Sequence, residues 1–199
     1  MKPLTLDDLL PLEEFASRRR ELLEAHGRYL DRQRRVRIGP RVSLVFENRQ
    51  TLWFRVQEML RIARLAEPDR VQQELDLQNR LLPGRERLQA ALLLEIQDEA
   101  RLTDELAPWQ TLQGEHLRLK IGERPYPANL LTCRPEDRCI GTAYWVQFVV
   151  DLVGRRRLVD FSRKVCFEMT LPAYQHQSPP LSEDVRQSLF DDLELSDRD

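Results

Sequence analysis

The strongest pattern in the chain is a switch of hydrophobic period within residues 42–65. From Val42 to Phe46 apolar residues alternate with others, which is the two-residue period of a strand. Asn48 then offers the N-cap of a helix. Beyond Asn48 the apolar residues recur at helical spacing, so one stripe of the helix should face a core. The stripe consists of Leu52, Trp53, Val56, Met59, Leu60 and Ala63.

The opposite face of this helix is also partly apolar. At about 100° per residue, Phe54 and Leu65 fall beside the polar side chains of Gln57, Glu58 and Arg61. A face that meets only water seldom carries two large apolar residues. We therefore expect a helix that is covered on both sides, with its three polar groups at least partly shielded from water.

The polar residues of this helix allow three interpretations. Glu58 and Arg61, three residues apart, can form an ordinary surface ion pair. They can instead belong to a buried structural network, because a shielded charge needs a partner. In the third interpretation, five residues line a functional pocket: Glu47, Arg49, Gln57, Glu58 and Arg61.

The rest of the chain alternates between helical and strand patterns. Helical spacing predicts helices over residues 11–30, 71–79, 98–106 and 182–190, the last of them capped by Ser182. Strands are expected at residues 35–38, 88–97, 115–121, 126–131, 142–152, 158–161 and 164–171. Pro125 and Pro127 lack a backbone donor, so the strand at 126–131 should lie at an edge of the sheet.

This order of elements predicts an α+β fold. We expect a single domain over residues 1–193, in which one mixed, largely antiparallel sheet packs with several helices. The acidic residues 194–199 should form a frayed tail.

Composition argues against several classes of function. The net charge is −2, and the basic runs at 18–20 and 32–37 alternate with acids as on a solvated helix face, so we expect no nucleic-acid binding. No apolar run approaches about 18 residues and the start lacks a signal-peptide pattern, so we expect a cytoplasmic protein without a membrane partner. Its three cysteines, Cys133, Cys139 and Cys166, should be free thiols.

Motifs for common chemistries are missing from the sequence. It has no glycine-rich phosphate loop and no G-x-S-x-G nucleophile elbow. Cys133 and Cys139 are spaced too widely for a zinc knuckle, and no E-x-x-H pair suggests a di-iron site. We therefore expect no metal site and cannot name a cofactor.

Two further regions hold candidate functional residues. His176, near Tyr174 in a proline-rich loop at 172–180, is the best placed proton carrier, since loops over a sheet often carry sites. Glu95, within the predicted strand at 88–97, is a second candidate for a shielded carboxylate. The candidate catalytic residues are therefore Glu58, Glu47 and His176. The candidate ligand-binding residues are Arg49, Gln57, Arg61, Glu95 and Tyr174.

Three stretches of the sequence carry a family resemblance. They are LVFENRQTLWFRVQEMLR at 44–61, QELDLQNRLLPG at 73–84 and PAYQHQ at 172–177. With them the chain resembles, over nearly its whole length, the bacterial family known as domain of unknown function number 3501. The resemblance implies no established activity or site. It does imply gene neighbourhoods that contain rubrerythrin-like di-iron proteins and iron-sulfur oxidoreductases.

Three hypotheses about function follow. The resemblance favours a cytoplasmic accessory or binding protein that works beside a redox or iron-sulfur partner. A small-molecule enzyme is the second, with Glu58 or Glu47 as acid or base, Arg61 or Arg49 holding an anion, and His176 completing the pocket. A structural homodimer, which uses the second face of the central helix as its interface, is the third.

Overall fold

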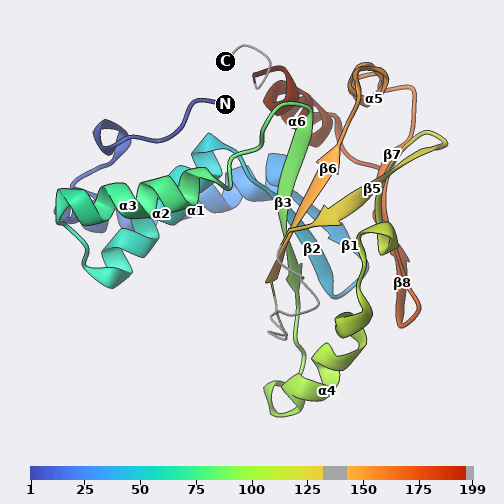
Figure 1. The fold of residues 1–199 in the computed structure, drawn as a ribbon, viewed down its shortest axis with the longest axis horizontal. Coiled ribbons are helices and arrows are strands. Elements are labelled where there is room, and N and C mark those ends of the chain that lie inside the picture. The colour runs from blue at the N-terminus through green and yellow to red at the C-terminus, as the bar shows by residue number, and fades with distance from the viewer. Residues whose placement is uncertain (132–142, 196–199) are drawn as a thin grey trace.

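A computed structural model describes residues 1–131 and 143–195. Its centre is one eight-stranded sheet with the order β1-β2-β3-β6-β5-β4-β7-β8 (Figure 1). The strands are β1 Arg35–Ile38, β2 Val42–Phe46, β3 Arg87–Leu94, β4 Leu117–Ile121, β5 Arg124–Leu130, β6 Ala143–Val149, β7 Val165–Leu171 and β8 Tyr174–Gln177. Each of the seven ladders within the described residues is antiparallel.

Helices pack with this sheet, so the predicted α+β class is confirmed. The α-helices of the described residues are α1 Leu12–Tyr29, α2 Arg49–Ala63, α3 Pro68–Asn79, α4 Leu102–Leu106, α5 Leu152–Leu158 and α6 Glu183–Leu195. A π-helical turn, Leu30–Arg34, follows α1 directly. Within the described ranges, no helix combines the length and the apolar character that crossing a membrane requires.

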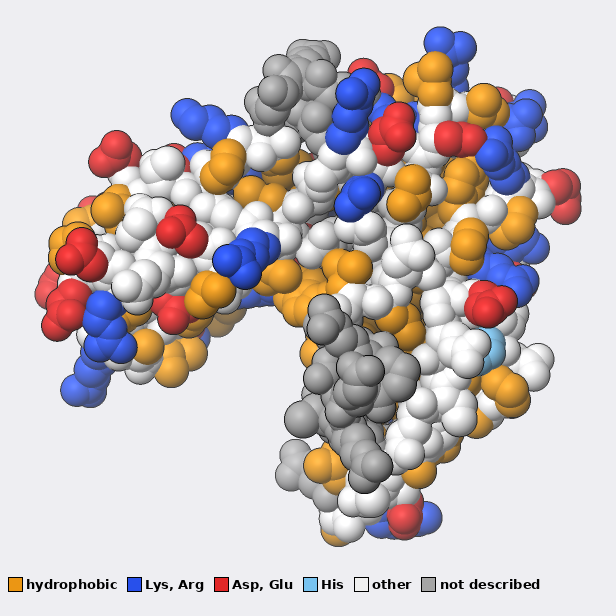
Figure 2. All heavy atoms as spheres, in the orientation of Figure 1, with side chains coloured by type: hydrophobic (Ala, Val, Ile, Leu, Met, Phe, Trp, Pro, Cys, Tyr) orange, Lys and Arg blue, Asp and Glu red, His pale blue; other side chains and the backbone are white. Residues whose placement is uncertain are grey.

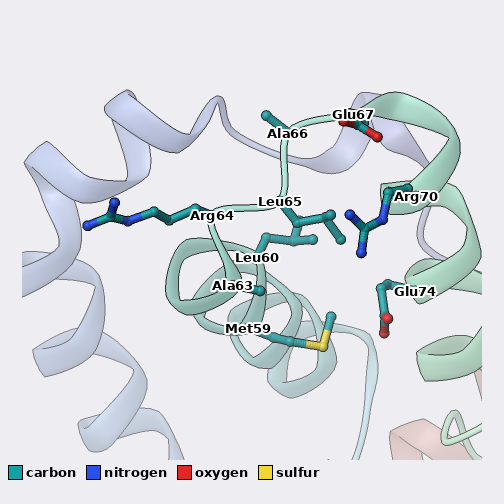
Figure 3. A pocket seen from close by; sticks show the side chains of 9 residues that line it. All are labelled: Met59, Leu60, Ala63, Arg64, Leu65, Ala66, Glu67, Arg70 and Glu74. Atoms are coloured by element: carbon teal, nitrogen blue, oxygen red, sulfur yellow. The ribbon is translucent and has the colours of Figure 1, made fainter.

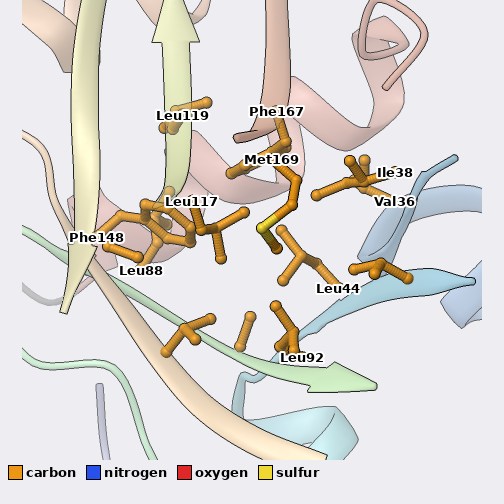
Figure 4. Packing of buried hydrophobic residues seen from close by; sticks show 14 of the residues in the cluster. Val36, Ile38, Leu44, Leu88, Leu92, Leu117, Leu119, Phe148, Phe167 and Met169 are labelled. Atoms are coloured by element: carbon orange, nitrogen blue, oxygen red, sulfur yellow. The ribbon is translucent and has the colours of Figure 1, made fainter. Parts of the chain in front are cut away.

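The sheet curls until its two edges almost meet. The hydroxyl of Tyr174 in β8 donates to the carbonyl oxygen of Ile38 in β1 (2.7 Å) and accepts from the backbone N–H of Arg41 (2.9 Å). The nearly closed, barrel-like sheet encloses the larger core, to which β1, β2, β3, β4, β6 and β7 all contribute (Figure 4). Rings of Phe46, Phe148 and Phe167 lie 5.2–6.4 Å apart there.

Helices α1, α2 and α3 form an arm that projects away from the sheet (Figure 1). We call these three helices the arm. A second, smaller core holds it together, because the apolar stripe of α2 packs on Val71 and Leu75 of α3. On the other side of α2, Phe15 of α1 contacts the rings of Trp53 and Phe54 edge to face. Both faces of α2 are thus covered, as predicted.

The switch from strand to helix also occurs where the pattern places it. The Asn48 side chain accepts hydrogen bonds from the backbone N–H groups of Gln50 and Thr51, both at 3.0 Å, and so caps α2. Buried strand β3, Arg87–Leu94, likewise overlaps most of the predicted range of 88–97.

Two predictions about the second half were wrong. Residues 158–161 are not a strand, because Leu158 is the last residue of helix α5. The Asp151 side chain caps the start of this helix by accepting from the Gly154 N–H (2.8 Å). The predicted loop at 172–180 contains strand β8, whose pairing with β7 the local residue types did not indicate. His176 therefore lies in a strand.

The position predicted for β5 was also wrong. The strand is not at an edge, because β4 pairs with it on one side and β6 on the other. The prolines are tolerated because β6 pairs only with residues 128–130, beyond both Pro125 and Pro127.

The remaining predictions concern the C-terminal tail and the three cysteines. Helix α6 includes Glu194 and Leu195, the first two residues of the predicted tail, while residues 196–199 lie outside the described ranges. Cys166 is buried and free, whereas Cys133 and Cys139 also fall outside the described residues.

Candidate functional site

Glu47 lies where the arm joins the sheet. Its side chain is fully buried, and it accepts a hydrogen bond from the Thr51 hydroxyl (2.8 Å) and pairs with the guanidinium of Arg55. Arg55 in turn lies over the ring of Trp145 in β6, 4.7 Å from its centroid. Glu47 thus holds a partly exposed cation against an aromatic ring, and its own carboxylate is engaged by Thr51 and Arg55.

A buried ion pair supports this junction from behind. Arg34 and Asp192 of α6 pair, with side chains 0% and 5% exposed. Arg34 also donates to the carbonyl oxygens of Phe46 (3.2 Å) and Glu47 (3.3 Å). Burial raises the pKa of Asp192, and the pairing with Arg34 opposes this increase. The interpretation of residues 32–37 as a solvated face was wrong for Arg34.

His26 of α1 is a titratable group beside the same junction. Its ring stacks on Phe54 with centroids 4.1 Å apart. Burial, together with the positive charges of Arg55 and Arg35, lowers its pKa from 6.5 to about 4. The imidazole is therefore neutral at pH 7.

The low pKa of His26 predicts a loss of stability in mild acid. The unfolded chain takes up this proton near pH 6.5 and the folded chain only near pH 4. Stability from this group is therefore complete above pH 6.5 and falls as the pH drops toward 4, by about 1–2 kcal/mol between pH 7 and pH 5. Urea denaturation at both pH values measures it. His26→Phe keeps a ring on Phe54 and should flatten the dependence; an equal loss in both proteins would contradict the assignment.

Glu58 and Arg61 form the predicted ion pair, but with a third partner. Arg61 donates to the Glu58 carboxylate at 2.9 Å, and Arg19 of α1 donates to the same group at 2.7 Å. Burial by itself would raise the pKa of Glu58, but the hydrogen bonds from Arg61 and Arg19 outweigh it and hold this pKa below its usual value. The trio fastens α1 to α2.

Two other candidates on α2 also contact the N-terminal segment. Arg49 pairs with Asp8 (2.6 Å), and this contact, together with hydrogen bonds from Thr5, lowers the pKa of Asp8 to about 2. The amide nitrogen of Gln57 donates to the carbonyl oxygen of Leu10 (3.4 Å). The amide oxygen of Gln57 is buried, and no group among the described residues donates a hydrogen bond to it.

Tyr174 and His176 lie together at the edge where the sheet nearly closes. Their rings are 4.3 Å apart, and Tyr174 also contacts Trp109 with centroids 5.1 Å apart. Gly39, at φ +68°, lies directly against the side chains of Tyr174 and His176. These contacts join the β1–β2 turn to β8, so the group has a clear structural role.

The prediction that Glu95 is shielded was wrong. Strand β3 ends at Leu94, and the side chain of Glu95 is exposed beyond it. The shielded carboxylate of this region is Glu105, which pairs with Arg41 and accepts from the backbone N–H groups of Gln97 (3.2 Å) and Asp98 (2.9 Å).

The sequence-predicted candidates therefore belong to separate groups of contacts. Glu47 lies at the arm–sheet junction, Glu58 with Arg61 between α1 and α2, and His176 with Tyr174 at the sheet closure. The residues that complete these groups were not identified from the sequence, because most of them pair with residues from a distant part of the chain. They are Arg19, Arg34, Arg55, Glu105, Trp145 and Asp192.

A pocket of about 190 Å³ lies at the turn between α2 and α3 (Figure 3). Met59, Leu60 and Leu65 form an apolar wall, and Arg70 and Glu74 of α3 form a charged one. None of the candidate catalytic or ligand-binding residues named from the sequence lines this pocket.

Comparisons with known proteins agree with the resemblance noted in the sequence. A family model described as "Protein of unknown function (DUF3501)" matches residues 3–193. A crystal structure of a novel protein of unknown function from Burkholderia pseudomallei K96243 is similar, with a TM-score of 0.85 and 26% sequence identity. The match covers 96% of this chain and 100% of that one. No curated protein matches.

Proposed function

Because this chain belongs to the family described as protein of unknown function (DUF3501), we propose a function from the arrangement of its own residues. The proposal is an accessory binding protein that acts in the cytoplasm and holds a protein partner between the arm and the sheet. The class of partner, a redox or iron-sulfur protein such as a rubrerythrin-like one, comes from the family resemblance.

The observation that carries this proposal is the contact of the Arg55 guanidinium with the Trp145 ring where the arm joins the sheet. Figure 2 shows hydrophobic side chains gathered at the inner corner where the arm meets the rest of the molecule. Arg55 keeps 33% of its side chain exposed while Glu47 and Trp145 fix its position. Arginine and tryptophan are common anchors of protein interfaces.

An exposed side of α2, between its two covered faces, extends this surface along the arm. Ile62 lies seven residues, about two turns, beyond Arg55 and so points to the same side of the helix. It is 70% exposed, a larger exposed fraction than that of any other large hydrophobic residue in the described part of the chain. Leu93 of β3, 38% exposed, adds an apolar group on the sheet. An exposed apolar strip with one oriented cation fits a protein partner.

Acid-base catalysis is less well supported by the same contacts. An enzyme built on Glu47, Glu58 and His176 would need them to approach one reacting atom. Each of the two carboxylates is instead held by arginines, and His176 packs against Gly39 and Tyr174.

The test is recovery of partners from the native host with two matched variants. Tagged wild-type protein should enrich a redox or iron-sulfur protein in quantitative mass spectrometry. Ile62→Glu places a charge in the proposed interface and should reduce this recovery at least about tenfold. Leu77→Glu is the control, because Leu77 is 51% exposed on the face of α3 opposite Val71 and Leu75.

The possible results separate the parts of the proposal. Enrichment without any redox protein would reject the class of partner. Equal recovery by both variants would reject the surface. Light scattering on the purified proteins tests the homodimer alternative, since a dimer through the same face would be disrupted by Ile62→Glu alone.

A further inference from the structure

The pocket at the turn between α2 and α3 lies at the end of the arm farthest from the sheet (Figures 1 and 3). It is therefore separate from the proposed partner surface at the junction. Helix α2 ends when Arg64 adopts a left-handed conformation (φ 50°) and the Leu65 N–H bonds to the Leu60 carbonyl oxygen (2.9 Å). This cap turns Leu65 back so that it lines the pocket.

The two walls of the pocket differ in chemistry. Met59, Leu60 and Leu65 supply aliphatic and thioether groups on one side. Opposite them, the side chain of Arg70 extends from α3 toward Leu65, and the carboxylate of Glu74 lies close by (Figure 3). A ligand held between the walls would meet a cation, an anion and an apolar surface at once.

The charges of the pocket are not neutralised by one another. Arg70 and Glu74 are one helical turn apart, at the spacing that favours an ion pair. Across the described residues, however, neither side chain takes part in an ion pair or a side-chain hydrogen bond, and Glu67 at the pocket rim pairs with neither. Both groups can therefore bind opposite charges on a ligand without breaking an existing contact.

The dipoles of helices α2 and α3 also place a positive and a negative end beside the pocket. The N-terminus of α3, where Glu67 provides no side-chain cap, is a positive end close to Arg70, and the carboxylates of Glu67 and Asp69 offset part of its charge. The C-terminus of α2 is a negative end on the other side of the turn. A carboxylate is thus favoured near Arg70, and an ammonium group near Glu74 and the end of α2.

We propose that this pocket binds a small aliphatic α-amino acid as a zwitterion. Arg70 pairs with the carboxylate, Glu74 with the ammonium group, and the side chain of the ligand lies against Met59, Leu60 and Leu65. The volume of about 190 Å³ is below the usual range for drug-sized ligands, about 300–1,000 Å³, and so restricts the ligand to this size class.

Calorimetric titration of the full chain with L-leucine tests the proposal. Wild-type protein should bind saturably at one site. Arg70→Gln and Glu74→Gln each remove one charge-assisted contact and should weaken binding about tenfold or more. Because neither side chain bonds to the rest of the protein, thermal melting should be unchanged. Arg80→Gln, which changes an exposed arginine at the C-terminal end of α3 and outside the pocket, should bind as wild type does.

Two analogues test the assignment of charges. 4-Methylpentanoate lacks the ammonium group and isoamylamine lacks the carboxylate, so each should bind at least about tenfold more weakly than L-leucine. Failure of wild-type protein to bind L-leucine saturably would overturn the proposal. So would binding that both charge-removing variants leave unchanged, or an analogue that binds as tightly as the amino acid. None of these results depends on partner recovery through the arm–sheet surface.

Discussion

An Asp192→Ala variant is expected to lose about 3–5 kcal/mol of unfolding free energy, because it leaves a buried guanidinium without its carboxylate. The Arg34 side chain is fully buried, and its remaining contacts are two carbonyl oxygens and the hydroxyl and carbonyl of Ser188. In a chain of this length the loss corresponds to a melting temperature lowered by roughly 10 °C. Urea denaturation followed by circular dichroism measures it.

Two controls separate the ion pair from a general effect on α6. Asp191→Ala changes the exposed neighbour, which accepts one bond from Gln187 (2.8 Å), and should cost no more than about 0.5 kcal/mol. The double variant Arg34→Met, Asp192→Leu removes both charges and should recover most of the stability. An Asp192→Ala protein as stable as wild type would show that the pair does not hold α6 to the sheet.

The Gly39→Ala variant should lose about 2–4 kcal/mol, for two reasons. At φ +68° a side chain is strained by about 1 kcal/mol or slightly more. A Cβ atom there would also lie 2.5 Å from the His176 ring and 2.6 Å from the Tyr174 hydroxyl, so the sheet closure must shift. The same denaturation experiment measures the loss.

Gly122→Ala is the matched control for this variant. Gly122 has nearly the same conformation, φ +60°, but nothing lies within 4 Å of its Cβ position, so only the strain of about 1 kcal/mol should remain. Adding His176→Ala to Gly39→Ala should relieve part of the steric cost. If the two glycine variants were equally stable, the contact between the β1–β2 turn and β8 would have no energetic weight.

Much of the local structure could be predicted from neighbouring residues. The alternation at 42–46 and the stripe from Leu52 to Ala63 correspond to β2 and α2, and Asn48 caps the helix as expected. These predictions succeed because period and capping depend on residues a few positions apart. The two covered faces of α2 were also predictable, since Phe54 and Leu65 do not suit a solvated surface.

Errors arose where a distant segment changed the outcome. Strand β8 forms because β7 offers it a partner, and β5 accepts prolines because β6 begins pairing beyond them. Glu95 was misplaced because the end of β3 decides which residues the sheet covers. Composition and period alone carry no information about these neighbours.

For the candidate residues, too, local features were predictable and distant partners were not. The sequence alone was enough to predict that Glu58 is a partly shielded carboxylate three positions from Arg61. It was also enough to place Glu47 just before the N-cap of a helix. Only tertiary contacts decided that Arg19 joins Glu58 from 39 residues away and that Asp192 meets Arg34 across 158. Repeating patterns are set by adjacent residues along the chain, whereas the partner of a buried charge is set by which helices and strands pack together in space.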